Sequence, residues 1–266
     1  MFRSYLLAFA AILLTGASAA AAARPADLSP AQRRVADKLV SQFENGTSKI
    51  QYCYIEALGD GRGYTAGRAG FTSATADLLE VAESYTKAVP GNALSPFLPR
   101  LRELAAEEDG SIDGLEGLPD AWRSSCADRR QREAQDAVVD EDYYKPARGR
   151  WRRLGLRTAL SLAAIYDAEI QHGGGEDPDG VPAMLKRARK KAGGSPQTGV
   201  SESRFLRAFL TVRRATLAFA HDPDTREVWA QSVGRVDVFR YLARTRQWRL
   251  AAPVRVRTDE YRLDLR

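Results

Sequence analysis

The 266-residue sequence has few residues that bind transition metals and no apolar segment long enough to span a membrane. It contains two cysteines and two histidines, which leaves little scope for a zinc site, and we expect neither a metal nor a cofactor. Hydrophobic residues make up 44% of the chain and charged residues 28%. It therefore lacks the low hydrophobicity and strong charge imbalance of disordered proteins. This composition and length predict a globular protein of one large domain or two lobes.

Several common functional motifs are also absent. No G-x-S-x-G elbow occurs, which argues against a serine hydrolase of that type. The glycine-rich run at residues 59–63, GDGRG, lacks the spacing of a dinucleotide fingerprint. Arg62 also stands where a calcium-binding loop would need a ligand. His172 and His221 lie far apart in the chain, so we expect both to have ordinary hydrogen-bonding roles.

The N-terminus has the pattern of a secretory signal peptide. Arg3 precedes a ten-residue apolar run at residues 5–14, which is too short to cross a bilayer. Small residues at 16–20 and 21–23 then offer two cleavage sites. We predict that residues 1–23 are removed and that residues 24–266 form the mature, extracellular or periplasmic protein, with no membrane association after cleavage.

Export would place the two cysteines in an oxidising compartment. In an oxidising compartment, two cysteines in one chain of this size favour a disulfide between Cys53 and Cys126. Two separate buried thiols are the alternative.

Charge is unevenly distributed along the chain, whose net charge is +6. Residues 41–118 hold twelve acidic and six basic side chains, whereas residues 226–266 hold ten arginines and five acidic side chains. A basic tail can indicate nucleic-acid binding. Here the arginines are interspersed with Asp and Glu, and no aromatic-rich binding motif accompanies them. We therefore expect an ion-paired surface and no nucleic-acid partner.

The first half of the chain combines helices with a small β element. Ser29, Pro30 and Gln32 form a capping-box pattern, and apolar residues then recur every four positions as far as Glu44, which predicts a helix. Residues 50–73 favour strands around the glycine-rich turn, which predicts a hairpin or three-stranded sheet. Helical periodicity resumes after residue 73. Residues 109–119, with three glycines and one proline, are predicted to be a loop between lobes.

The second half is predicted to be helical throughout. Residues 157–170 are apolar nearly all round, which is typical of a buried central helix, and further helices are expected at 181–192 and 201–220. The fold class is therefore mainly α, with a small β element near the N-terminus. Asp167 lies in the most apolar helix, where an unpaired carboxylate would be costly.

Two carboxylates near the glycine-rich turn are candidates for acid/base chemistry. Glu44 is predicted at a helix C-terminus beside Phe43, where the helix dipole and partial burial disfavour the ionised form and suit a general acid. Asp60 lies between two glycines, and backbone N–H groups and Arg62 favour its ionised form, which suits a base. Two carboxyl groups in different environments are the catalytic groups that glycoside hydrolases use.

The residues around these carboxylates resemble the glycoside hydrolase family 46 chitosanases. The resemblance is most specific between residues 41 and 99, including SQFEN at 41–45 and GDGRGYTAG at 59–67. It continues at residues 131–136, 166–168, 208–213 and 221–226, and becomes loose after about residue 227.

The resemblance implies a lysozyme-like, two-lobed helical fold with a small β-sheet beside the cleft. It implies internal hydrolysis of β-1,4-linked glucosamine polymers, with chitosan as substrate and inversion at the anomeric carbon. Glu44 would be the general acid and Asp60 the general base, with Thr65 holding the attacking water. Arg62 would tune the site, and Asp77 would meet a substrate ammonium group.

The remaining implied roles concern subsites and core packing. Tyr54 and Glu56 are candidate subsite residues. Asp167 is expected to form ion pairs with Arg213 and Arg226. We expect the enzyme to act as a monomer.

Departures from the family pattern flank the substrate-facing region. Ala74 and Ala76 stand where many members have glycine, and Arg68 and Ala69 replace a more apolar pair. Two other functions stay open: a lysozyme-like muramidase that cleaves peptidoglycan, and a catalytically inactive relative that binds polysaccharide.

Overall fold

The computed structural model describes residues 27–266. The predicted signal peptide, residues 1–23, lies outside the described residues. Within residues 27–266, no helix combines the length and apolar character needed to cross a membrane.

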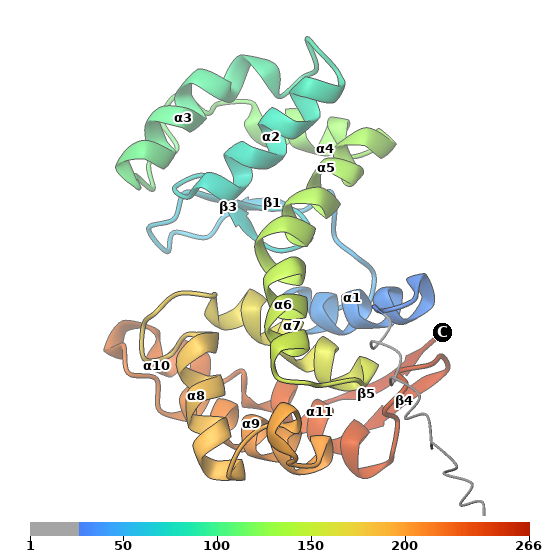
Figure 1. The fold of residues 1–266 in the computed structure, drawn as a ribbon. Helices are drawn as coiled ribbons and strands as arrows, with labels where there is room; N and C mark the ends of the chain where they lie inside the picture. Colours follow the sequence, from blue (N-terminus) through green and yellow to red (C-terminus); the bar gives the residue numbers. More distant parts are fainter. Residues whose placement is uncertain (1–26) are drawn as a thin grey trace, which may run out of the picture.

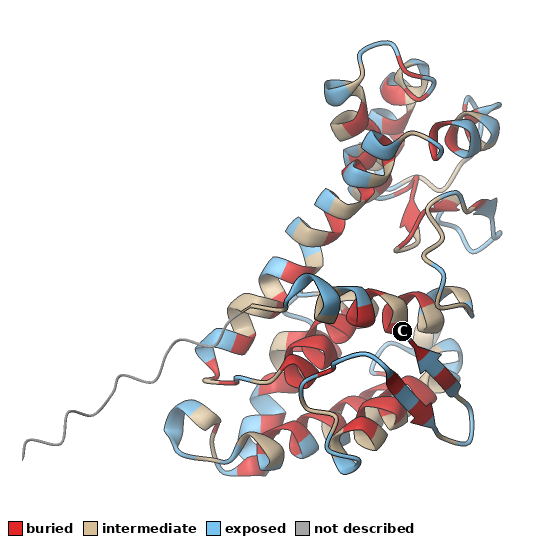
Figure 2. Ribbon diagram, turned by 90° about the vertical axis from the view of Figure 1, so that its right-hand side faces the viewer, coloured by how far each residue is buried: buried red, intermediate tan, exposed pale blue. Residues whose placement is uncertain are grey.

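The described chain forms two lobes (Figures 1 and 2). The sheet lobe contains the three-stranded sheet and the helices α2 to α4. The helical lobe contains α1 and the chain from α6 to the C-terminus. The sheet-lobe elements are β1 (Ile55–Ala57), β2 (Tyr64–Ala66), β3 (Phe71–Thr72), α2 (Ala76–Ala88), the 3-10 turn η1 (Ser95–Phe97), α3 (Leu98–Glu107) and α4 (Leu118–Ser125). The predicted mainly helical, two-lobed fold is confirmed.

A long helical segment connects the lobes (Figure 1). It consists of α5 (Arg129–Val139), one π-helical turn η2 (Asp140–Tyr144) and α6 (Lys145–Arg153), in unbroken succession. The prediction that residues 109–119 link the lobes was wrong, because this loop joins α3 to α4 within the sheet lobe. One of its three glycines is needed for close packing, since a Cβ on Gly110 would lie 1.9 Å from the carbonyl oxygen of Gly61. Gly110 therefore supports the turn that carries Asp60.

The small sheet is antiparallel, with strand order β1-β2-β3. Thr65 on the central strand lies opposite Glu56 of β1 and Thr72 of β3. The turn between β1 and β2 is the glycine-rich run, in which Gly59, Gly61 and Gly63 all have positive φ (70°, 80° and 72°). A side chain is strained in that conformation, so glycine is required to fold the loop tightly.

Helix α1 (Pro30–Asn45) forms as its sequence predicts. The Ser29 side chain accepts a hydrogen bond from the Gln32 backbone, and the Gln32 side chain accepts one from the Ser29 backbone. At the other end, Gly46 adopts a left-handed conformation (φ 67°), which terminates the helix. Glu44 is thereby placed in the last turn of α1.

The core of the helical lobe surrounds α7 (Ala159–His172), which is buried along nearly its whole length. Figure 2 shows these buried residues concentrated in the middle of the lobe. The predicted central helix is confirmed, as are the next two helices. The helices and turn that follow are α8 (Val181–Ala192), η3 (Pro196–Thr198), α9 (Glu202–Ala218), α10 (Pro223–Ala230) and α11 (Val233–Arg244).

The chain ends in a β-hairpin that the sequence analysis did not predict. Strands β4 (Val254–Arg257) and β5 (Arg262–Leu265) pair in an antiparallel register, with their apolar side chains buried and their charged side chains exposed. Arg257 pairs with Asp264 at 2.8 Å on the exposed face, which agrees with the expected ion-paired surface.

A disulfide bond joins Cys53 to Cys126, and their Cα atoms lie 5.2 Å apart. It fastens the segment before β1 to the end of α4, so the pairing that export favours is present in the fold. The free-thiol alternative does not apply, because no cysteine of residues 27–266 is free.

Candidate active site

A cleft of about 1070 Å³ runs between the two lobes. Both lobes line it: α1, α7, α10 and α11 contribute from the helical lobe, the sheet and α2 from the other, and η2 from the connecting segment. Its charged and aromatic lining includes Phe43, Glu44, Tyr54, Arg62, Asp77, Glu80, Asp142, Tyr143, Trp229 and Arg235. Four of these side chains are acidic, and the two basic ones are both engaged in ion pairs. The cleft therefore offers a negative surface to a substrate.

Glu44 enters the cleft from the last turn of α1 and forms an ion pair with Arg235. The Arg235 Nη2 atom donates a hydrogen bond to Glu44 Oε1 over 2.7 Å, and the Glu44 side chain is 28% exposed. A residue of α11 therefore holds this carboxylate in position at the end of α1.

Arg235 forms ion pairs with two carboxylates, Glu44 and Asp167. It lies 2.8 Å from Asp167 Oδ1, and Asp167 also binds Arg213 at 2.6 Å. All three side chains are buried, and burial alone would raise the pKa of Asp167, but Arg235 and Arg213 hold that pKa below its usual range. The expected pairing of Asp167 with Arg213 is confirmed.

The prediction that Arg226 pairs with Asp167 was wrong. Its guanidinium donates to the carbonyl oxygens of Ala220 (2.9 Å) and His221 (3.4 Å), at the end of α9. Arg235 takes its place because α11 packs against α7 and α9 and turns this arginine into the core. His172 extends the network with an ordinary hydrogen bond, since its Nε2 accepts from Arg213 Nε over 3.3 Å.

Asp60 occupies the tip of the glycine-rich turn in the sheet lobe. Arg62 donates three hydrogen bonds to it: Nη2 and Nε donate to Oδ2 over 2.6 and 3.0 Å, and the backbone N–H donates to Oδ1 over 3.1 Å. These hydrogen bonds hold the pKa of the Asp60 carboxyl below its ordinary value. The expected ionised form is therefore favoured, as a general base requires.

Thr65 lines the cleft from the central strand of the sheet. Its side-chain hydroxyl is buried and has no hydrogen-bond partner among residues 27–266. A buried hydroxyl of this kind normally finds a partner. Because Thr65 lines the cleft, a water molecule that reaches the hydroxyl from the cleft would satisfy it.

Asp77 lies in the first turn of α2 and is held firmly. Its Oδ1 accepts hydrogen bonds from the Thr72 and Leu78 backbones and from the Thr75 hydroxyl, over 2.5 to 3.0 Å. Burial raises its pKa in spite of these bonds. An ammonium group bound in the cleft would compensate for this burial.

Tyr54 and Glu56 lie at one edge of the cleft. The Tyr54 hydroxyl donates to Glu56 Oε2 over 3.2 Å. Tyr54 lines the cleft, whereas Glu56 is exposed beside it. The structure thus brings Tyr54 to the site and places Glu56 in contact with Tyr54.

The sequence alone predicted no role for several cleft residues, among them Glu80, Asp142 and Tyr143. Glu80 lies one turn after Asp77 on α2, a spacing that puts both on one helix face and could have identified it. Burial raises the pKa of both Glu80 and Asp142. The neighbouring Asp142 raises the pKa of Glu80 further, whereas a hydrogen bond with Glu80 lowers the pKa of Asp142 and so offsets part of its increase. Asp142 and Tyr143 come from the π-helical turn, whose position no local pattern indicates.

A two-lobed helical fold with carboxylates from both lobes at an acidic cleft defines a polysaccharide hydrolase. Residues 38–254 match the family described as Glycosyl hydrolase family 46, and the chain belongs to that family. It is therefore an enzyme, a glycoside hydrolase.

Individual relatives agree with this assignment. A chitosanase of Bacillus subtilis (strain 168) is 52% identical over 236 residues, which cover 89% of this chain and 85% of that protein. A crystal structure of a variant chitosanase from Bacillus subtilis MY002 complexed with 6 GlcN superposes with a TM-score of 0.84 at 50% identity, covering 90% of this chain and 100% of the other. A chitosanase from Gynuella sunshinyii in complex with chitotetraose gives a TM-score of 0.83 at 47% identity, with coverages of 90% and 99%.

Proposed function

We propose that this chain is an endo-acting chitosanase that hydrolyses the β-1,4 linkages between glucosamine units of chitosan with inversion of configuration. The observation that carries the mechanism is the contrast between two carboxylates: Glu44 lines the cleft, and Asp60 lies beside it, bound to Arg62, which lines the cleft. Glu44 comes from the helical lobe and is bound to a shared arginine, whereas Asp60 comes from the sheet lobe and is held ionised by Arg62. Carboxyl groups in different environments take opposite roles in acid/base hydrolysis.

Glu44 is assigned as the general acid that protonates the glycosidic oxygen. Once Glu44 has given up its proton, Arg235 stabilises the carboxylate that remains. Arg235 also binds Asp167, so Glu44 shares this arginine with a second carboxylate. Arg235 thus acts as a positioning residue between the acid and the core.

Asp60 is assigned as the general base that activates water on the opposite face of the sugar ring. The unpartnered hydroxyl of Thr65 provides a hydrogen bond for that water. Inversion needs space for the water between the two carboxyl groups, typically roughly 6.5–9.5 Å.

The acidic lining suits a cationic polysaccharide. Asp77 is half-buried, Glu80 and Asp142 are exposed, and the pKa values of all three are raised because desolvation makes their charged forms costly without a cation. Glucosamine ammonium groups would lower that cost. The complexes of relatives with 6 GlcN and chitotetraose support the same substrate class.

We also propose that the mature enzyme lacks residues 1–23, works in the extracellular space or periplasm, and acts as a monomer. N-terminal sequencing of exported protein and size-exclusion chromatography with light scattering test these points.

Release of reducing ends from chitosan, chitin and peptidoglycan, measured in parallel, tests the proposed activity. We expect rapid release from chitosan, with long oligomers dominating early because cleavage is internal. Release from peptidoglycan alone would instead identify a muramidase. Binding to chitosan without release would identify an inactive polysaccharide-binding relative.

A further inference from the structure

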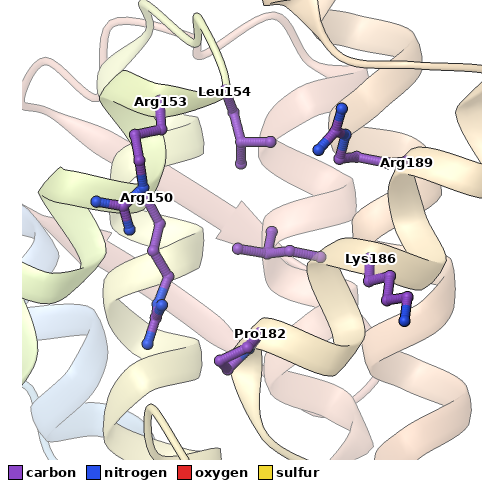
Figure 3. A pocket seen from close by; sticks show the side chains of 7 residues that line it. Arg150, Arg153, Leu154, Pro182, Lys186 and Arg189 are labelled. Carbon is purple, nitrogen blue, oxygen red and sulfur yellow. The ribbon is translucent and has the colours of Figure 1, made fainter. Parts of the chain in front are cut away.

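A second hollow, of about 460 Å³, lies between α6 and α8 in the helical lobe (Figure 3). It shares no lining residue with the cleft between the lobes. Its lining consists of four basic and three apolar side chains: Arg150, Arg153, Leu154, Pro182, Leu185, Lys186 and Arg189. We call it the basic pocket.

Most of the positive charge in the basic pocket is not neutralised. Arg150 forms an ion pair with the buried carboxylate of Glu169 and donates to the Gly174 carbonyl oxygen over 3.1 Å. Within the described part of the chain, no carboxylate forms an ion pair with Arg153, Lys186 or Arg189, and all three side chains are exposed. Arg153 lies near enough to Glu169 to interact with its charge, but the three cations together exceed the negative charge beside them and attract an anion.

The lining also restricts the chemistry of that anion. Arginine guanidinium groups match phosphate with two parallel hydrogen bonds, and the pocket has three of them. Its apolar surface comes from Leu154, Leu185 and Pro182, and no aromatic side chain is among the residues that line it. Nucleic-acid-binding proteins stack bases on aromatic rings, so this surface does not favour bases.

The charge continues beyond the pocket. Lys190 and Lys191 follow on α8, Arg152 precedes Arg153 on α6, and all three are exposed. None of them forms an ion pair with another described residue. A basic surface that extends past a single phosphate site suits an extended ligand with repeated charges.

We propose that the basic pocket and its flanking residues bind the phosphate groups of a linear phosphate polymer without aromatic bases, such as inorganic polyphosphate or a polyol phosphate chain. The enzyme would then carry two surfaces of opposite charge, an acidic cleft for a cationic polysaccharide and a basic face for an anionic polymer. Binding at this face leaves the cleft free. It also accounts for a net charge of +6 on a protein that acts on a polycation.

The test is binding of inorganic polyphosphate to the protein in the absence of chitosan, because chitosan itself binds polyphosphate. Isothermal titration compares the wild type with a pocket variant, R153Q/K186Q/R189Q. The matched control is K87Q/R207Q/R262Q, which removes the same charge from exposed positions on other elements. None of these three residues forms an ion pair with another described residue. We expect a loss of affinity of about tenfold or more in the pocket variant and less than about threefold in the control, with chitosan hydrolysis unchanged in both.

Three results would overturn the proposal. Equal losses in the two variants would show that net charge alone attracts polyphosphate, and absence of wild-type binding would remove the site altogether. Tighter binding of a single-stranded oligonucleotide with the same number of phosphates, or of vesicles containing anionic lipid, would identify a different class of ligand. If the triple variant is thermally destabilised, Arg189→Gln alone serves in its place, with a smaller loss expected in the same direction. Unchanged affinity in that single variant would also count against the pocket.

Discussion

The guanidinium of Arg235 lies 2.7 Å from the carboxylate of Glu44, although 191 positions separate the two residues in the sequence. The same guanidinium binds Asp167 in the core helix α7. The proposed general acid is therefore connected through Arg235 to a fully buried carboxylate. A disturbance of the core at Asp167 reaches Glu44 through one side chain.

Replacement of Asp167 tests the core network. Asp167→Asn leaves Arg213 buried without a counter-charge and Arg235 with Glu44 alone, and breaking a buried ion pair costs roughly 3–5 kcal/mol. At this chain length that corresponds to a fall in Tm of about 6–20 °C. Thermal unfolding measures it. Asp237→Asn is the control, since Asp237 pairs with Arg214 and Arg240 at the surface, where such pairs contribute about 0–1 kcal/mol. Equal Tm values for the two variants would show that the network does not stabilise the fold.

The pH profile tests the state of Asp60. Arg62 holds the pKa of the Asp60 carboxyl below its ordinary value, so the base stays ionised to lower pH. Activity is lost as the pH falls through that lowered pKa, because the base becomes protonated. In Arg62→Gln the pKa rises, and the acidic limb of kcat/KM should move to higher pH.

Arg102→Gln is the matched control for the pH profile, because Arg102 pairs with Glu83 on the surface of α2. Its acidic limb should coincide with that of the wild type. If the acidic limb of Arg62→Gln also coincides with that of the wild type, the limb reflects the titration of a group other than Asp60.

Thr65 offers a test of water positioning that is separate from stability. Its hydroxyl has no hydrogen-bond partner in the described chain, so Thr65→Val leaves no protein group unpaired. We expect an unchanged Tm and KM but a kcat lower by up to about 10²-fold, because misplacement of a reactant has effects of that size. Thr65→Ser restores the hydroxyl and should recover much of the lost kcat. If serine and valine reduce kcat equally, the hydroxyl has no such role.

The catalytic roles predict specific losses. Glu44→Gln leaves no proton donor for the glycosidic oxygen, and Asp60→Asn leaves no base for the water. General acid and base groups typically contribute about 10²–10⁴-fold each, so either variant should lose kcat by such a factor. Titration with a chitosan oligomer should still show binding in both variants. Turnover near the wild-type rate in either variant would contradict its assigned role.

The sequence predicted those parts of the fold that local patterns determine. The capping box and the four-residue periodicity placed Glu44 at the end of α1, and three glycines with positive φ placed Asp60 at a turn tip. The partner of Glu44 was missed because it depends on long-range packing. Arg226 and Arg235 are both arginines of the C-terminal region, and only the docking of α11 against α7 decides which of them reaches the core.

The missed hairpin has a different cause. The strands at 254–257 and 262–265 alternate apolar and charged residues, which is a local strand pattern. Their many arginines were interpreted only as part of a charged surface. The loop at 109–119 was misplaced because glycine in a sequence does not distinguish a flexible linker from a close backbone contact. Gly110 has the second role, against Gly61.

The central claim is that Glu44 and Asp60 hydrolyse the linkage by one direct, inverting displacement. The most direct measurement is proton NMR of the products in the first minutes of chitosan hydrolysis, before mutarotation equilibrates the anomers. Because the substrate is β-linked, direct attack by water predicts that the α-anomer of the new reducing end appears first. Initial appearance of the β-anomer would demonstrate retention through a covalent intermediate and would contradict the assignment of Asp60 as a general base.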